Sequence, residues 1–401
     1  MSKPPRFLYV ANHAGHFILH HLPIVKAVKE AGFEVHIAAP GEPDSLERVM
    51  VPDARHLIEG MGFPFHPVTI KRGQVNLTEE VAALYSLYSL YRFLRPDLVY
   101  HATIKPVIYG GIISRLTGVP AAINAVTGLG HTFLSSGKRA LLLKQLVKLA
   151  YRSALGHHNS RVIFQNPDDY RLFVDTGIVE QKRASVIYGS GVNINEFGYS
   201  PESDSQPPVV LLASRMLWSK GVGEFVEASA KLQGEGIKAR FVLVGDSDPG
   251  NPETISRQQL QTWHHSGLVE WWGWRRDMPN VFRQSAVFCL PSFYPEGIPK
   301  VLLEAASSGR PIITTATPGC REVVRDNENG LLIPPHDVGA LANAIQKLLE
   351  DPELRQEMGS RSREIAEREF REEVVTETIV DLCRRLLSEA NLEASDKQSD
   401  R

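Results

Sequence analysis

Two carboxylates separated by seven residues, Glu296 and Glu304, flank the predicted start of a helix. Pro299 is well placed as the first residue of that helix, because its missing N–H costs nothing in the first turn. The free backbone N–H groups and the positive dipole end at a helix start suit a phosphate group. The two carboxylates add acceptors that can hold sugar hydroxyls nearby. A phosphate site beside hydroxyl acceptors indicates that this segment binds a nucleotide sugar.

Two cations, Arg215 and Lys220, lie in another predicted loop, where the apolar run Val209–Ala213 leads towards a helix that begins near Val222. Arg makes forked contacts with phosphate oxygens and Lys acts as a point charge, so together they can neutralise a diphosphate leaving group. Two solvated loop cations would be the simpler interpretation if these residues stood alone. Their predicted place in the same domain as the Glu296 loop favours the functional interpretation.

The elements that position these groups read as a parallel α/β arrangement. Val287–Leu290 is an apolar run of strand length, the helix after Glu296 closes at Gly309, and the β-branched run Ile312–Thr315 follows. In open parallel sheets, ligands bind outside the carboxyl ends of the strands. The polar, proline-bearing linker Pro201–Pro208 marks the start of the domain that carries these elements.

The first half of the chain opens with the same order of strand, loop, helix and strand. Phe7–Ala11 and Glu34–Pro40 are strand-like runs on either side of a helical pattern, as in a doubly wound α/β domain. The first loop lacks GxGxxG, which argues against a dinucleotide cofactor. Gly15 in that loop either lets the backbone approach a phosphate or serves as a plain turn glycine. His101 ends another predicted strand, where sites form in parallel sheets, although a lone histidine is more often structural.

Residues 135–156 read as a basic amphipathic helix. Lys144, Lys148 and Arg152 recur every four residues, so they line one helix face, and leucines supply a broad apolar surface. The segment contains no acidic residue. This pattern is typical of a helix that lies on an anionic membrane surface. An ordinary packing helix with a solvated basic edge is the alternative.

The 401 residues are enough for two domains, each with its own core. We expect an N-terminal domain over residues 1–200, a C-terminal domain over 201–370, a terminal helix over 371–390 that packs back towards the N-terminal domain, and a flexible tail over 391–401. No apolar run reaches the roughly 18 residues that a spanning helix needs, so none is expected. The first residues lack the apolar core and cleavage site of a secretory signal.

Cysteine, histidine and charge argue against several other classes. The 3 cysteines and 14 histidines are scattered without metal-type spacing, which argues against a metal site, and the few cysteines favour a reducing compartment. Residues 1–200 carry 21 Lys and Arg against 15 Asp and Glu, whereas residues 201–401 carry 23 against 31. The basic half is therefore a candidate for meeting an anionic partner. It lacks the dense basic face and aromatic platforms of a nucleic-acid binder.

The segment Pro291–Cys320 resembles the signature of glycosyltransferase family 4, whose members are retaining enzymes with the two-domain GT-B fold. Glu296 and Glu304 match the donor-site motif of that family, and Ser214-Arg215 with Lys220-Gly221 matches its Arg and Lys-Gly pair. The resemblance implies an α/β chain of two Rossmann-like doubly wound domains that face each other across a cleft.

A narrower resemblance comes from the first half. The segments His101–Pro106, Tyr109–Gly111 and Asn124–Gly130 resemble bacterial enzymes that extend polyprenyl-diphosphate-linked sugars in O-antigen, capsule or glycan synthesis. This resemblance implies transfer of a hexose or N-acetylhexosamine, with UDP as the expected donor nucleotide and a lipid-linked saccharide as acceptor. It also implies a cytoplasmic protein, peripheral on the inner face of the cell membrane, which the basic helix at 135–156 suits.

The resemblance also implies roles for individual residues. Glu296 would contact hydroxyls of the donor sugar and Glu304 the ribose, while Arg215 and Lys220 would bind the diphosphate and stabilise the charge that develops on it. The other residues implied at the donor are Gly297 and Ile298 through their backbone N–H groups, Lys300, and Gly15 from the first domain. His101, also from the first domain, is predicted to be catalytic together with Glu296, Arg215 and Lys220. The resemblance implies no metal and no other cofactor, and no side chain is assigned as a base.

Two other functions stay open at the level of sequence. One is an inactive family member that binds sugar nucleotide or membrane as a partner subunit; the presence of all four donor groups argues for activity. The other is a nucleotide-sugar epimerase of the same architecture, which would need acid and base groups at C2 of the sugar. Nothing in the sequence identifies such groups.

Overall fold

The computed structural model describes residues 3–43, 50–71, 76–128, 138–202 and 206–399. The chain forms two compact units: unit 1 comprises residues 1–190 and 373–401, and unit 2 comprises residues 191–372. The linker composition places the boundary ten residues later, at 200/201. In the structure, residues 191–200 pack with unit 2, because Val192 and Phe197 lie in its hydrophobic core.

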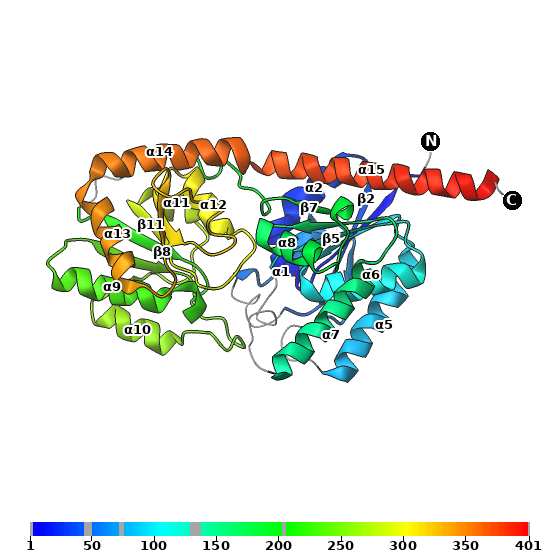
Figure 1. The fold of residues 1–401 in the computed structure, drawn as a ribbon, viewed down its shortest axis with the longest axis horizontal. Coiled ribbons are helices and arrows are strands. Elements are labelled where there is room, and N and C mark those ends of the chain that lie inside the picture. Colours follow the sequence, from blue (N-terminus) through cyan, green and yellow to red (C-terminus); the bar gives the residue numbers. More distant parts are fainter. Residues whose placement is uncertain (1–2, 44–49, 72–75, 129–137, 203–205, 400–401) are drawn as a thin grey trace. The chain divides into compact units, whose positions relative to one another are not determined.

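Unit 1 is built on a seven-stranded parallel sheet with helices on both faces (Figure 1). Its strand order is β3-β2-β1-β4-β5-β6-β7. The direction of growth reverses between β1 and β4, which makes the unit doubly wound. The strands are β1 (Arg6–Val10), β2 (Glu34–Ala39), β3 (Phe65–Pro67), β4 (Leu98–Ala102), β5 (Ala121–Val126), β6 (Ser160–Phe164) and β7 (Ala184–Val186).

The helices of unit 1 follow the apolar periodicity of the sequence. The helix predicted over 76–94 is α5, and Asn76 caps it by accepting a hydrogen bond from the Thr78 N–H at 3.1 Å. The segment after β1 is more irregular, because a π-helical turn separates two α-helical pieces. The helices are α1 (Ala14–His16), η1 (Phe17–His21), α2 (Leu22–Glu30), α4 (Ala54–Gly60), α5 (Leu77–Leu94), α6 (Ile104–Thr117), α7 (Lys138–Leu155), α8 (Pro167–Asp175) and the short η3 (Gln181–Arg183).

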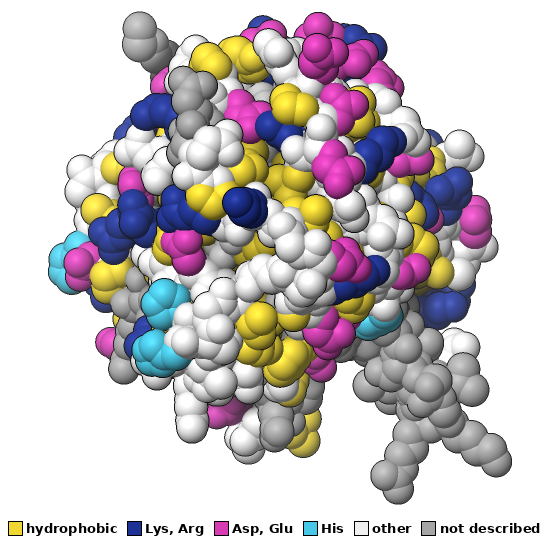
Figure 2. All heavy atoms as spheres, turned by 90° about the vertical axis from the view of Figure 1, so that its left-hand side faces the viewer, with side chains coloured by type: hydrophobic (Ala, Val, Ile, Leu, Met, Phe, Trp, Pro, Cys, Tyr) yellow, Lys and Arg dark blue, Asp and Glu magenta, His cyan; other side chains and the backbone are white. Residues whose placement is uncertain are grey.

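Unit 2 repeats the architecture with six parallel strands in the order β10-β9-β8-β11-β12-β13. Its strands are β8 (Val209–Ala213), β9 (Arg240–Val244), β10 (Glu270–Trp271), β11 (Val287–Leu290), β12 (Ile312–Thr315) and β13 (Gly330–Ile333). Its helices are η4 (Trp218–Lys220), α9 (Val222–Gly234), α10 (Arg257–His265), α11 (Met278–Arg283), α12 (Lys300–Ser307), α13 (Val338–Glu350) and α14 (Pro352–Glu369). Separate apolar clusters cover the two faces of the sheet. On the face of the molecule shown in Figure 2, basic and acidic side chains are interspersed.

The last helix, α15 (Glu372–Ser399), packs in unit 1. Val375, Ile379, Cys383 and Leu386 recur every three or four residues and lie in the same core as α2. The segment from Asn391, expected to be a flexible tail, is helical up to Ser399, where α15 ends. The polar composition of this segment predicts exposure, but its Glu, Ala and Lys residues are also good helix formers.

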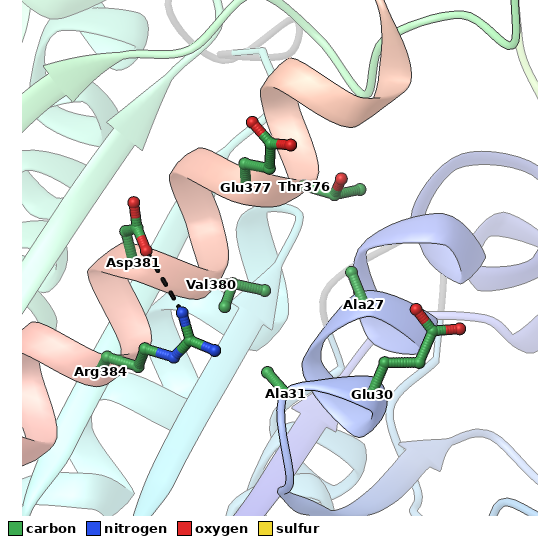
Figure 3. Close-up of a pocket in the computed structure, with 8 residues that line it drawn as sticks. All are labelled: Ala27, Glu30, Ala31, Thr376, Glu377, Val380, Asp381 and Arg384. Atoms are coloured by element: carbon green, nitrogen blue, oxygen red, sulfur yellow. Dashed lines mark ion pairs between the residues drawn. The ribbon is translucent and has the colours of Figure 1, made fainter.

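An open hollow lies between α2 and α15 (Figure 3). Ala27 of α2 and Ala31, the residue just after this helix, face Val380 of α15 across it, and Asp381 pairs with Arg384 at 3.6 Å along its edge. Among the described residues, no helix is long and apolar enough to cross a membrane.

Candidate functional site

The predicted donor residues cluster at the point where the strand order of unit 2 reverses. Strands β8 and β11 pair in parallel, with Val287 opposite Val210 and Phe288 opposite Leu211. Arg215 and Lys220 follow β8, and Glu296 follows β11. Ligands of open α/β sheets bind beside the carboxyl ends of strands at such a reversal. The topology therefore gathers residues about 80 positions apart at one edge of the sheet.

Lys220 and Glu296 form an ion pair at this edge, between the ammonium and Oε2 of the carboxylate. Their side chains are only 10% and 16% exposed. The Ser292 hydroxyl donates to the other carboxylate oxygen, Oε1, at 2.9 Å. Because both oxygens have fixed partners, the carboxylate is oriented before any ligand arrives.

Close backbone packing explains why Gly221 follows Lys220. Gly221 has φ +74°, and a Cβ there would lie 2.2 Å from the carbonyl oxygen of Pro291. The Phe293 N–H also donates to the Ser219 carbonyl at 3.1 Å. The loop after β8 is thus fixed directly against the end of β11, which holds the ammonium of Lys220 beside Glu296.

The segment after β12 supports the Glu296 loop from the other side. The Thr314 hydroxyl donates to the Leu290 carbonyl at 2.6 Å, and the Thr315 hydroxyl donates to the Ser292 carbonyl. Gly319 has φ +87°, and a Cβ there would lie 1.8 Å from the carbonyl oxygen of Gly297. Sequence reasoning missed this supporting role, although the Pro318-Gly319 dipeptide is a turn signal that marks the contact.

Arg215 has a partner that sequence reasoning also missed. Its guanidinium donates to the carboxylate of Asp248 at 2.8 Å, and Asp248 is fully buried. The backbone N–H of Asp248 in turn donates to the Thr254 hydroxyl at 2.8 Å. No short motif links positions 215 and 248, so only the pairing of β8 with β9 brings these side chains together.

Glu304 lies in the second turn of α12 and has no side-chain hydrogen bond within the described residues. Burial raises the pKa of this carboxyl to about 7; the Lys300 ammonium opposes the shift and the Glu196 carboxylate adds to it. A carboxyl group without hydrogen-bond donors around it is suited to accept them from a ligand.

The remaining donor residues surround the start of α12. The helix begins at Lys300, one residue after the predicted start, and Pro299 precedes it in an extended conformation. Gly297 and Ile298 are buried in the preceding loop, and Ile298 belongs to the core of unit 2. Gly297 and Ile298 thus lie in the loop just before α12, and Lys300 is the first residue of this helix.

The two residues predicted from the first half lie in unit 1. Gly15 is buried in the short α1, directly after β1, and Val10 of β1 stands opposite His101 of β4. His101 has no exposed surface. Its Nε2 lies 2.8 Å from the Tyr91 hydroxyl and its Nδ1 lies 2.8 Å from Oδ1 of Asn124. Burial lowers the pKa of His101 to about 4, so the imidazole is neutral at physiological pH.

This environment favours the structural interpretation of His101. A Cβ added at Gly110 would lie 2.3 Å from Nε2, so the ring fills a close-packed position between α5 and α6. Within the described residues, both ring nitrogens already have partners, and contact with a substrate would require those bonds to break. Both ring nitrogens are thus occupied in this structure, and the catalytic role of His101 stays a prediction.

The basic helix predicted over 135–156 is α7, and the side chain of Lys144 lies outside those that the structure describes. Lys148 is half-buried, and Leu149 is mostly exposed. Arg152 donates to the carbonyls of Thr176 at 2.9 Å and Gly177 at 3.2 Å. Arg152 therefore also serves to hold the loop after α8.

The arrangement in unit 2 suits recognition of a diphosphate beside a sugar. Two fixed cations and a helix start adjoin two carboxylates, one of which is only weakly acidic. The family model for glycosyl transferases group 1 matches residues 194–365, and the model for glycosyl transferase 4-like domains matches residues 6–166. The chain belongs to glycosyltransferase family 4. It is a glycosyltransferase with the GT-B fold, as the resemblance of its donor motif predicted.

Individual relatives of this glycosyltransferase act on lipid-linked sugars. It is 28% identical over 357 residues to the N,N'-diacetylbacillosaminyl-diphospho-undecaprenol alpha-1,3-N-acetylgalactosaminyltransferase of Campylobacter jejuni. The matched residues make up 86% of this chain and 89% of the relative. It is 26% identical over 348 residues to the UDP-Gal:alpha-D-GlcNAc-diphosphoundecaprenol alpha-1,3-galactosyltransferase of Escherichia coli, over 83% and 87% of the two chains. The structure of Anabaena HepE in complex with UDP shares the fold, with a TM-score of 0.74 at 21% identity over 96% of this chain and 100% of that one.

Proposed function

We propose that this glycosyltransferase moves a hexose or N-acetylhexosamine, with retention of configuration, from a UDP-sugar to a polyprenyl-diphosphate-linked saccharide at the cytoplasmic face of the membrane. The observation that carries the proposal is the cluster of Arg215, Lys220, Glu296 and Glu304 around the β8–β11 reversal. The two relatives named above, whose acceptors are diphospho-undecaprenol-linked sugars, support the choice of acceptor.

In this proposal, orientation matters more than excess charge. Each cation already has a carboxylate partner, Asp248 for Arg215 and Glu296 for Lys220, so the four groups carry no net charge before the donor binds. As the bond between the sugar and the diphosphate breaks, negative charge grows on the phosphate oxygens. Fixed donors aimed at that position stabilise the charge without having to reorganise.

The two carboxylates hold the rest of the donor. Glu296, fixed by Lys220 and Ser292, accepts hydrogen bonds from hydroxyls of the transferred sugar. Glu304, eight positions later on α12, accepts them from the ribose. The backbone N–H groups of Gly297 and Ile298, with Lys300, contribute on the phosphate side. The departing phosphate takes the proton of the acceptor hydroxyl, so no protein base is assigned.

Metal independence is part of the proposal. The two cations take the place that a divalent ion would otherwise fill opposite a diphosphate. Activity should therefore be the same with and without EDTA. If EDTA abolished the activity and only an added divalent cation restored it, the proposal of metal independence would be wrong.

We also propose that residues 135–156 bring the enzyme to an anionic membrane surface. The support is the charge pattern of the helix, including the partly exposed Lys148 and the mostly exposed Leu149. Changing Lys144, Lys148 and Arg152 together to Glu should weaken cosedimentation with anionic vesicles. Unchanged cosedimentation would refute this attachment.

The test of the transferase proposal is a screen of nucleotide sugars against polyprenyl-diphosphate-linked saccharides, with products identified by mass. We expect product with a UDP-sugar, formed at a rate about 10²- to 10³-fold lower by the Lys220→Met variant. A folded protein that binds UDP but yields product with no pair would favour the alternative, a sugar-nucleotide-binding subunit. An epimerase would instead convert the UDP-sugar without any acceptor.

A further inference from the structure

Helix α5 carries apolar side chains on two separate faces. Ala83, Leu87, Tyr91 and Leu94 form the inner stripe and are buried against the sheet of unit 1. A second stripe with the same spacing points outwards, about 120° away around the helix axis. Its members are Leu77, Val81, Tyr85 and Tyr88, and these side chains are between 41% and 79% exposed. An ordinary surface helix is polar on its outer side.

The acidic residues of α5 do not offset this outer face. Glu79 and Glu80 are its only acidic residues. Glu79 pairs with Lys71 at 2.8 Å, and Glu80 pairs with Lys105 at 2.7 Å while accepting a hydrogen bond from Tyr109 at 2.6 Å. Both negative charges are therefore neutralised at the N-terminal end of the helix.

The positive charges at the other end remain available. Arg92 and Arg95 are exposed, and neither forms an ion pair among the residues that the structure describes. The outer face of α5 thus combines large apolar side chains, two tyrosines and a net positive charge. Within unit 1, α5 lies beside α6 at the edge of the helical layer (Figure 1).

We infer that the outer face of α5, formed by Leu77, Val81, Tyr85, Tyr88 and Arg92, docks on an anionic lipid bilayer. Exposed aliphatic and aromatic side chains enter the boundary between headgroups and acyl chains, where tyrosine is favoured. The arginines face the lipid phosphates. This surface lies outside residues 135–156, and it deepens the proposed function because it would hold the enzyme where a lipid-linked acceptor resides.

The inference is tested by cosedimentation of the full chain with phosphatidylcholine–phosphatidylglycerol vesicles. Val81→Ser combined with Tyr85→Ser should lower the vesicle partition coefficient about tenfold, since binding scales with buried apolar area. The control pair Leu57→Ser and Val374→Ser removes exposed apolar side chains from other helices and should change nothing. Arg92→Gln should weaken binding to anionic vesicles and leave binding to pure phosphatidylcholine unaltered.

Two further measurements separate this inference from its competitors. Transfer to a short-chain acceptor in detergent should be equal in the wild type and the α5 variant. If the wild type showed no transfer in this assay, that result would count against the proposed function alone. Equal vesicle binding by wild type and α5 variant would overturn the inference. If the wild type were a dimer in solution and the α5 variant a monomer, the face would be an interface between copies of the chain and the inference would be wrong.

Discussion

Replacing Glu304 by Gln should stabilise the unliganded enzyme, and the gain should depend on pH. Burial raises the pKa of this carboxyl from 4.5 to about 7. Between these values the unfolded chain releases the proton while the folded chain keeps it. Folding stability is therefore lost as the pH rises from about 4.5 towards 7, and the full loss persists above 7. Gln cannot ionise, so the variant avoids this loss.

The size of the effect follows from the shift. About 2.5 pKa units correspond to about 3 kcal/mol at 1.36 kcal/mol per unit. Urea denaturation should show Glu304→Gln more stable than the wild type by about 3 kcal/mol at pH 8 and by only about 1 kcal/mol at pH 5. Glu357→Gln, at an exposed glutamate of α14, is the matched control and should change stability at neither pH.

Ligand binding provides a second measurement on the same residue. Ribose hydroxyls that donate to Glu304 would favour its ionised form, so UDP binding near pH 6 should release a proton. Calorimetry in buffers of different ionisation enthalpy measures that release, which Glu304→Gln should abolish while weakening affinity. An equal stability gain at pH 5 and pH 8 would refute the reasoning, because the carboxyl would then not be desolvated.

Four other substitutions test the remaining parts of the site. Lys220→Met should lower kcat about 10²- to 10³-fold with the fold retained, whereas Arg361→Met, at an exposed ion pair, should leave steady-state rates unchanged. Asp248→Asn should release Arg215 and raise the KM for the donor, as measured by initial rates; an unchanged KM would contradict the positioning role. Gly221→Ala should destabilise unit 2, seen as a lower Tm, because its Cβ would clash with the Pro291 carbonyl. His101→Ala should lower Tm but preserve kcat per folded molecule at low temperature; a loss of kcat would instead support its predicted catalytic role.

Much of the fold could be predicted because parallel strands buried on both faces are near-continuous apolar runs. Val287–Leu290 and Ile312–Thr315 begin and end where the sequence places them. The boundary between the units and the end of α15 could not be predicted as well. Proline and polar composition mark exposure, whereas the boundary depends on which core Val192 and Phe197 join.

The candidate site, too, could be predicted only in part from the sequence. The groups proposed to face a ligand, such as Lys220 and Glu296, are recognisable because their spacing within local loops matches a family motif. The residues that hold these groups in place are not recognisable from the sequence. Asp248 and Thr315 belong to distant parts of the chain and reach the site only through the sheet topology. For His101 the sequence left the orientation open, since a position at a strand end does not reveal whether the side chain turns into the core, where the structure places it.

The most direct test of the account is an experimental structure of the enzyme with UDP bound. The account predicts phosphate oxygens within hydrogen-bond distance of Arg215 and Lys220, and ribose hydroxyls on Glu304. A diphosphate bound away from both cations, with ribose contacts elsewhere, would contradict it.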